Sequence, residues 1–446
     1  MRRETVFFLS VVLSLAISVF FQRHISHAQT ISNRSVLDWP TGVTVYKPEK
    51  CYNGFTIVVP YRAEHMFLID MKGRVVHVWR MDPEGHWQCG FLELLHNKNW
   101  ISFSYQTDLS GDVQDPFIWL ETGPGMTFRS QFSEIDWNGN VVWRYKPPKG
   151  SMAHHDMARL SNGNTIMMLE KEISAPHISN KKIKENYYIE VTPENEIVWE
   201  WYTSEHFNEF EFSEEAKRLI YQQGGDCFHA NTLEVLPGNE LGLKDSRFRK
   251  ENILSCQRNT NYIFIIDKQT KKIVWKWGET HLVGPHHPTM LHNGNILIYD
   301  NGGRAGYPIR NRFYTRLIEI NPVTGNIVWE YRHEPMNIKP TSKFFSSSWG
   351  SLQRLPNGNT FSLDCHKGRL FEVSPQGEIV WEYISPFFWG RGTAVVENGI
   401  YRAYRYSYDD IPQADEYFKN TDGHVGVCKA DIMLPKNLGL PSDDLP

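Results

Sequence analysis

Three histidines of this 446-residue chain stand at matching places before similar turns. His155 and His286 each lie seven residues before the first asparagine of an Asn-Gly-Asn turn, and His229 begins a less regular hairpin of the same kind. Arg258 ends the strand that follows His229. If these strands meet around one axis, three imidazoles and a guanidinium converge on one small-molecule site.

Two chemistries suit this set. In the first, the arginine binds two oxygens of a tetrahedral anion, one histidine attacks as nucleophile, and the others donate protons or hydrogen bonds. In the second, the three histidines hold a metal ion with an open position. A guanidinium would repel that ion unless it binds a substrate anion, and this weighs against the metal.

Further residues near these strands are candidates for substrate contacts, namely Asn231, Arg304 and His287. Side chains alternate along a strand, so His154 and His287 should point away from the site. Both stay in reserve, because a register shift of one residue would exchange them with His155 and His286.

The elements that must position these residues form an internal repeat. A hairpin that ends in a tryptophan recurs six times, with spacings of 52 to 76 residues, and its last residues are Trp79, Trp143, Trp199, Trp275, Trp329 and Trp381. A second hairpin with an Asn-Gly type of turn lies between the copies. Two hairpins make four strands, and a period of about 55 residues suits a propeller blade.

The fold class is therefore all-β, a six-bladed β-propeller of four-stranded blades. A hairpin from Thr393 to Arg405 lacks its own tryptophan partner and should complete the blade begun by residues 67–79, which closes the ring. The tryptophans are expected to pack between blades. Ser213 is the expected cap of the one helix-like stretch, and Cys227 with Cys256 is a candidate cross-strand disulfide.

Composition and the N-terminus limit the function further. The chain is 41% hydrophobic and 22% charged, with a net charge of −4, which excludes a disordered protein, a multi-span membrane protein and a polybasic nucleic-acid binder. Residues 1–28 are expected to be a signal peptide, with residues 6–21 as its apolar run or as an uncleaved anchor. The folded part is then extracytoplasmic, periplasmic or secreted. The expected divisions are an extension (29–50), the propeller (51–410) and a tail (411–446).

Several motifs together resemble the aryl-sulfate sulfotransferase family: HHDMARLSNGNT, FHANTLEVLP, ILSCQRNTNYIFIID, GPHHPTMLHNGNILIYDNG and GSLQRLPNGNT. The resemblance runs from about Gly54 to Tyr383, and Pro288 marks a divergent branch. It implies a secreted six-bladed propeller that moves a sulfuryl group between phenols by ping-pong kinetics, without a nucleotide donor.

The resemblance also implies roles for the four residues. His286 matches the nucleophile that becomes sulfated, His229 and Arg258 match groups that hold the sulfuryl oxygens, and His155 matches a histidine for proton transfer. We expect a phenolic sulfate donor, a phenol acceptor, no cofactor, no nucleic acid, and membrane contact only through an uncleaved leader. The alternatives are a non-catalytic ligand- or protein-binding propeller, a three-histidine metalloenzyme and a quinoprotein dehydrogenase.

Overall fold

The computed structural model describes residues 40–61, 63, 65–80, 88–107, 128–332, 344–388 and 398–414. The expected signal peptide lies outside these residues, as does the tail from residue 415. In the part of the chain that is described, no helix is both long and apolar enough to cross a membrane.

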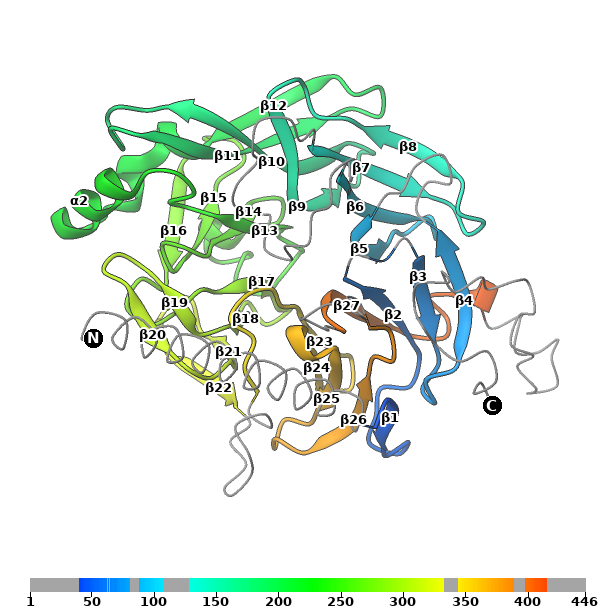
Figure 1. The fold of residues 1–446 in the computed structure, drawn as a ribbon. Coiled ribbons are helices and arrows are strands. Elements are labelled where there is room, and N and C mark those ends of the chain that lie inside the picture. The colour runs from blue at the N-terminus through cyan, green and yellow to red at the C-terminus, as the bar shows by residue number, and fades with distance from the viewer. Residues whose placement is uncertain are drawn as a thin grey trace, which may run out of the picture.

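Six antiparallel sheets surround a common axis, so the chain is a six-bladed β-propeller, as the repeat predicts (Figure 1). The first blade contains β2 (Phe55–Pro60), β3 (His65–Ile69) and β4 (Val75–Arg80), and the second β5 (Gln88–Leu94), β6 (Trp100–Thr107), β7 (Phe128–Ile135) and β8 (Val141–Tyr145). The third contains β9 (Ser151–Arg159), β10 (Thr165–Ser174), β11 (Lys182–Val191) and β12 (Ile197–Tyr202).

The fourth blade contains β13 (Ala230–Val235), β14 (Ile253–Gln257), β15 (Tyr262–Ile266) and β16 (Ile273–Trp277). The fifth contains β17 (His286–Met290), β18 (Ile296–Asp300), β21 (Arg316–Ile320) and β22 (Ile327–Tyr331), with the small hairpin of β19 (Gly303–Ala305) and β20 (Arg310–Arg312) inserted. The sixth contains β23 (Leu352–Arg354), β24 (Thr360–Asp364), β25 (Arg369–Val373) and β26 (Ile379–Ile384).

The two ends of the described chain close the ring in both directions. β27 (Ile400–Tyr406) pairs with β2 and becomes the innermost strand of the first blade. β1 (Gly42–Tyr46) pairs with β26 and adds a fifth, outer strand to the last blade. The sequence predicted the first of these pairings but not β1, which lies in the stretch expected to be an extension.

The repeated tryptophans join neighbouring blades. The indole Nε1 of Trp275 donates to the carbonyl of Pro322, which lies in the outer hairpin turn of the next blade, at 2.9 Å. The same bond recurs from Trp79, Trp199, Trp329 and Trp381. The bond from Trp381 reaches Met71 and so ties the last blade to the first. These contacts explain the tryptophan at the end of five of the six copies, whereas Nε1 of Trp143 has no hydrogen-bond partner among the described residues.

The Asn-Gly type turns also have a second function. Asn164, the last residue of such a turn, donates from Nδ2 to Glu190 on the third strand of its own blade at 2.7 Å. The pairs Asn99–Glu134, Asn295–Glu319 and Asn359–Glu372 repeat this contact. In these four blades the inner hairpin is thereby held to the outer one.

The connection into the fourth blade carries the helices. A 3-10 helix, η1 (Thr203–Phe210), precedes α2 (Glu214–Gln223), which lies at the outside of the ring (Figure 1). The Ser213 hydroxyl accepts from the Ala216 backbone N–H at 3.1 Å, which confirms the predicted cap. Two shorter 3-10 helices are η2 (Ser246–Phe248) and η4 (Cys365–Lys367).

The expected disulfide between Cys227 and Cys256 is wrong, since both are buried free thiols. Cys256 lies opposite Thr232 across the β13–β14 pair, whereas Cys227 precedes the strand. The two thiols also pack in different apolar clusters, and the Cys256 thiol donates to the Pro285 carbonyl at 3.1 Å.

Candidate active site

The inner strands change register where the predicted site residues lie. In β9 the bulge falls between Ala153 and Met157, and His155 takes a left-handed φ of 53°. His229 has a φ of 52°, beside the register shift at the start of β13. Such backbone costs about 1–3 kcal/mol in a non-glycine residue and is typical of functional sites, because a bulge re-aims a side chain.

Three imidazoles meet at these register shifts. The Nε2 atoms of His155 and His229 are 3.3 Å apart. The ring of His154 lies 4.2 Å from that of His155 and 5.6 Å from that of His229, measured between centroids. The bulge therefore brings His154 into the cluster, where regular alternation would have turned it away.

The hydrogen bonds of His155 and His229 form a continuous chain. The Tyr401 hydroxyl oxygen lies 2.9 Å from Nδ1 of His155. At the other end, Nδ1 of His229 lies 2.5 Å from the Asp226 carboxylate, which requires a proton on that nitrogen. His155 then donates from Nε2 to His229, and its own Nδ1 accepts from Tyr401. The chain can carry a proton between a bound substrate and Asp226.

Burial and neighbouring charges control the protonation of this group. Burial lowers the pKa of His155 well below its usual value, and the nearby imidazoles lower it further. Burial opposes ionisation of Asp226, but the attraction and hydrogen bond of His229 outweigh it and hold the carboxyl pKa well below its usual range. At neutral pH the site thus holds a neutral His155 and an ionised Asp226.

His286 is held in a single tautomer. Its Nδ1 lies 2.7 Å from Oδ1 of Asn301 and 3.1 Å from the Gly284 carbonyl, and both are acceptors, so Nδ1 carries the proton. The Asn301 amide cannot flip, because its Nδ2 donates to the carbonyls of Ser346 and Trp349. The lone pair of His286 therefore lies on Nε2.

The His286 imidazole is also kept neutral. It is 1% exposed. Burial and then the charge of Arg258 lower its pKa well below the usual value. A neutral imidazole with a free Nε2 is the form that can attack an electrophile.

Arg258 reaches the site as the strand pairing predicts. Its backbone N–H donates to the His229 carbonyl at 3.0 Å. Its guanidinium donates to Asn259 at 2.7 Å and to the Ser347 carbonyl at 3.3 Å. A guanidinium has five N–H donors, so several remain for an anion. The structure thus brings His155, His229, His286 and Arg258 close enough for their charges to affect one another.

A buried ion pair holds the backbone beside the histidine cluster. Arg402 of β27 binds both carboxylate oxygens of Asp156, at 2.8 and 2.9 Å. The same carboxylate accepts from the Leu233 backbone N–H at 2.9 Å, and so connects β9, β13 and β27. Because Asp156 follows His155 directly, this pair fixes the backbone that presents the imidazole.

The other predicted contact residues lie elsewhere. Asn231 is fully buried and donates to the Pro285 carbonyl at 3.0 Å, so it joins two blades rather than facing a substrate. His287 is buried against Tyr404, with 3.1 Å between Nε2 and the hydroxyl. Arg304 is exposed on β19, and no contact joins it to the histidines. The structure therefore leaves none of the three in the histidine cluster.

An aromatic wall borders the cluster, and sequence reasoning missed it. Tyr401 stacks on His155 with 5.7 Å between ring centroids and lies 6.1 Å from Trp349. Trp349 in turn contacts Tyr61 at 4.6 Å and stacks on His366 at 4.8 Å. Burial lowers the pKa of His366 to about 4, so this wall is uncharged at neutral pH.

Asp226, Asn301 and Tyr401 are the other site residues that the sequence did not assign. Asp226 lies only three residues before His229, and Asn301 follows the strand after His286, so both were within reach of the motifs. Tyr401 and Arg402 come from β27, and only ring closure brings them to the site.

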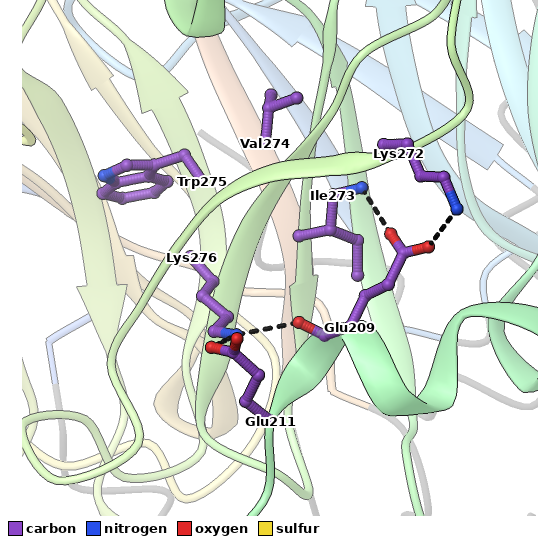
Figure 2. Close-up of a pocket in the computed structure, with 7 residues that line it drawn as sticks. All are labelled: Glu209, Glu211, Lys272, Ile273, Val274, Trp275 and Lys276. Atoms are coloured by element: carbon purple, nitrogen blue, oxygen red, sulfur yellow. Dashed lines mark hydrogen bonds and ion pairs between the residues drawn. The ribbon is translucent and has the colours of Figure 1, made fainter.

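A surface pocket lies away from these histidines. Figure 2 shows it between the end of η1 and the outer strand β16. Its charges pair with each other, Lys272 with Glu209 at 3.0 Å and Lys276 with Glu211 at 2.5 Å. The pocket therefore offers no unpaired charge to a ligand, and the histidine cluster stays the candidate active site.

Comparisons with known proteins agree with the fold and the motifs. The chain matches the family described as Arylsulfotransferase (ASST) over residues 42–381. No curated protein sequence matches it significantly.

Solved structures are similar only at a distance. A protein of unknown function from Bacteroides caccae is 12% identical, with a TM-score of 0.46 and coverage of 79% of this chain and 98% of that one. Virginiamycin B lyase from Staphylococcus aureus is 11% identical, with a TM-score of 0.38 and coverage of 78% and 84%. Likenesses this low carry no argument about function.

Proposed function

Because the chain belongs to the arylsulfotransferase family, we propose that it moves a sulfuryl group from a phenolic sulfate ester to a phenol through a sulfated His286. The observation that carries this proposal is the fixed tautomer of His286. Its Nδ1–H is held by Asn301 and Gly284, its lone pair lies on Nε2, and the Arg258 charge is close enough to lower the pKa of the ring.

The first half-reaction forms a bond from Nε2 of His286 to sulfur and breaks the bond from sulfur to the phenolic oxygen. The N–H groups of Arg258 that are not hydrogen-bonded stabilise the sulfuryl oxygens as the charge shifts. The pair formed by His155 and His229 first takes up a proton, and Asp226 stabilises its positive charge. It then gives this proton to the departing phenolate and returns to its neutral form. Because the proton on Nδ1 stays with neutral acceptors, the sulfated imidazole keeps a positive charge and remains a good donor.

The second half-reaction reverses these steps with an acceptor phenol. The acceptor loses its proton to the pair of His155 and His229, and the Asp226 carboxylate stabilises the positive charge that this pair gains. Its oxygen attacks sulfur and restores the free Nε2 of His286. The wall formed by Tyr401, Trp349 and Tyr61 supports an aromatic substrate, since aromatic rings pack favourably on one another.

The same proposal places the reaction outside the cytoplasm. Arg2 and Arg3 precede an apolar run over residues 6–21, the pattern of a secretory leader or an anchor. We propose a periplasmic or secreted enzyme, tethered to the membrane only if the leader is not cleaved.

The test is a burst experiment with 4-nitrophenyl sulfate. The wild type should release one equivalent of 4-nitrophenol per active site and turn over repeatedly only when a phenol is added. The variant His286→Ala should give neither the burst nor labelling by a sulfur-35 donor. His292→Gln changes an exposed histidine in a turn of the same blade and is the matched control. Undiminished label in His286→Ala would exclude His286 as the nucleophile.

A further inference from the structure

His154, His155 and His229 have the arrangement of ligands around a metal ion. One ring nitrogen from each lies within 4.8 Å of the others. The Nε2 atoms of His155 and His229 are 3.3 Å apart. Two nitrogens bound to a tetrahedral zinc ion, each at about 2.0–2.1 Å, are separated by about 3.3 Å. The third imidazole would close up on the other two when an ion binds.

The other nitrogen of each ring faces an oxygen of a neighbour. Nδ1 of His229 lies 2.5 Å from Asp226, and Nδ1 of His154 lies 3.5 Å from the Glu170 carboxylate, an ion-pair contact without a hydrogen bond. Nδ1 of His155 lies 2.9 Å from the Tyr401 hydroxyl. Carboxylates and other oxygens in this position are typical of metal-binding histidines, because they fix the tautomer and leave Nε2 for the metal.

His154 has a ring nitrogen to which the proposed reaction gives no role. Its Nε2 is buried and has no hydrogen-bond partner among the described residues. The proposed sulfuryl transfer does not use this nitrogen. The side chain of His229 is 26% exposed, against 11% for His154, so an ion can enter there.

We propose that these three histidines bind one transition-metal ion of the zinc class, and that the bound ion blocks the transferase. Binding moves the proton of His155 from Nε2 to Nδ1, where the Tyr401 oxygen can accept it. Glu170 and Asp226 offset part of the positive charge. The blocking effect rests on the proposed function, since the ion occupies His155 and His229, which that function needs for proton transfer. Metal binding itself does not depend on it.

The test uses untagged, chelator-treated protein titrated with Co²⁺, followed by visible absorption, and then with Zn²⁺ in competition. One equivalent should bind with the bands of a tetrahedral site, and Zn²⁺ should displace it. His154→Gln should weaken binding at least about 100-fold, because it removes a ligand. His292→Gln should bind like the wild type. Absence of the Co²⁺ bands, or equal affinity in His154→Gln, would overturn the site.

Two further measurements keep the outcomes separate. If His154→Gln does not fold, Glu170→Gln keeps the side-chain shape and should weaken metal binding about 10–100-fold. Unchanged affinity in that variant would overturn the site.

One equivalent of Zn²⁺ should stop acceptor-dependent phenol release, and a chelator should restore it. Metal binding without transfer under any condition refutes the proposed function but not the site. If sulfuryl transfer continues while the ion is bound, or if transfer requires the ion, the proposed inhibition by the metal is refuted.

Discussion

The substitution Asn301→Asp tests whether His286 acts as a neutral nucleophile in a fixed tautomer. Asn301 accepts the His286 Nδ1–H at 2.7 Å, and aspartate keeps an acceptor oxygen at the same place. It adds a negative charge beside the ring, however. In the wild type, burial and Arg258 lower the pKa of His286 well below its usual value, so the rate of the burst should stay flat across neutral pH and fall only in acid.

The size of the effect follows from the geometry. Two unit charges about 4 Å apart interact by about 4 kcal/mol at an effective dielectric constant near 20, which corresponds to about 3 pKa units. A carboxylate stabilises the imidazolium, so the pKa rises and the nucleophilic form is lost as pH falls through the raised value. The acid limb should therefore move up by about 2–3 units, while the rate above that limb recovers.

The assay is the rate of the 4-nitrophenol burst between pH 4 and pH 9, with folding checked by thermal unfolding. Asn301→Asp also loses the Nδ2 bonds to the Ser346 and Trp349 carbonyls, so it should be less stable. Asn359→Asp is the matched control, because Asn359 makes similar Nδ2 bonds in the inner-hairpin turn of the sixth blade, to Lys50 and Glu372. An acid limb that does not move, or that moves equally in the control, would refute the reasoning.

Two other substitutions test proton transfer and ring closure. Asp226→Asn should slow transfer about 10- to 150-fold in stopped-flow measurements, because a hydrogen bond to a charged group contributes about 1.5–3 kcal/mol; a change below about threefold would contradict the role of the carboxylate. Trp381→Phe should lower the free energy of unfolding in urea by about 2–3 kcal/mol, since a fully buried indole loses its bond to Met71 and part of its packing. Trp329→Phe, whose half-buried indole bonds to Pro375, should cost about 1 kcal/mol, and equal losses would contradict a special role for the closing blade.

The repeat made the fold predictable. Each hairpin carries its own turn residues and ends in a tryptophan that contacts the next blade, so local sequence and blade packing agree. The pairing that brings Arg258 beside His229 is also local, because β13 and β14 are consecutive strands. Features of this kind are readable because the residues that make them are close together in the chain.

Contacts made across the ring were not predictable in the same way. Tyr401 and Arg402 reach the site only because β27 pairs with β2, a strand far away in sequence. The Asn301 amide is oriented by carbonyls of the segment that contains Ser346 and Trp349, which belongs to no repeated motif. A single sequence holds no local signal for such partners, although it places the strands that carry them.

The prediction that His154 points away from the site failed for a local physical reason. Alternation assumes a regular strand, and β9 is regular only up to Ala153 and again from Met157. Between them His155 takes a left-handed conformation, and the bulge turns His154 and His155 toward the same group of imidazoles. A regular strand would turn only one of these two histidines toward the cluster. The strained bulge turns both, so a single strand supplies one member of the proposed proton-transfer pair, His155, and the third proposed metal ligand, His154.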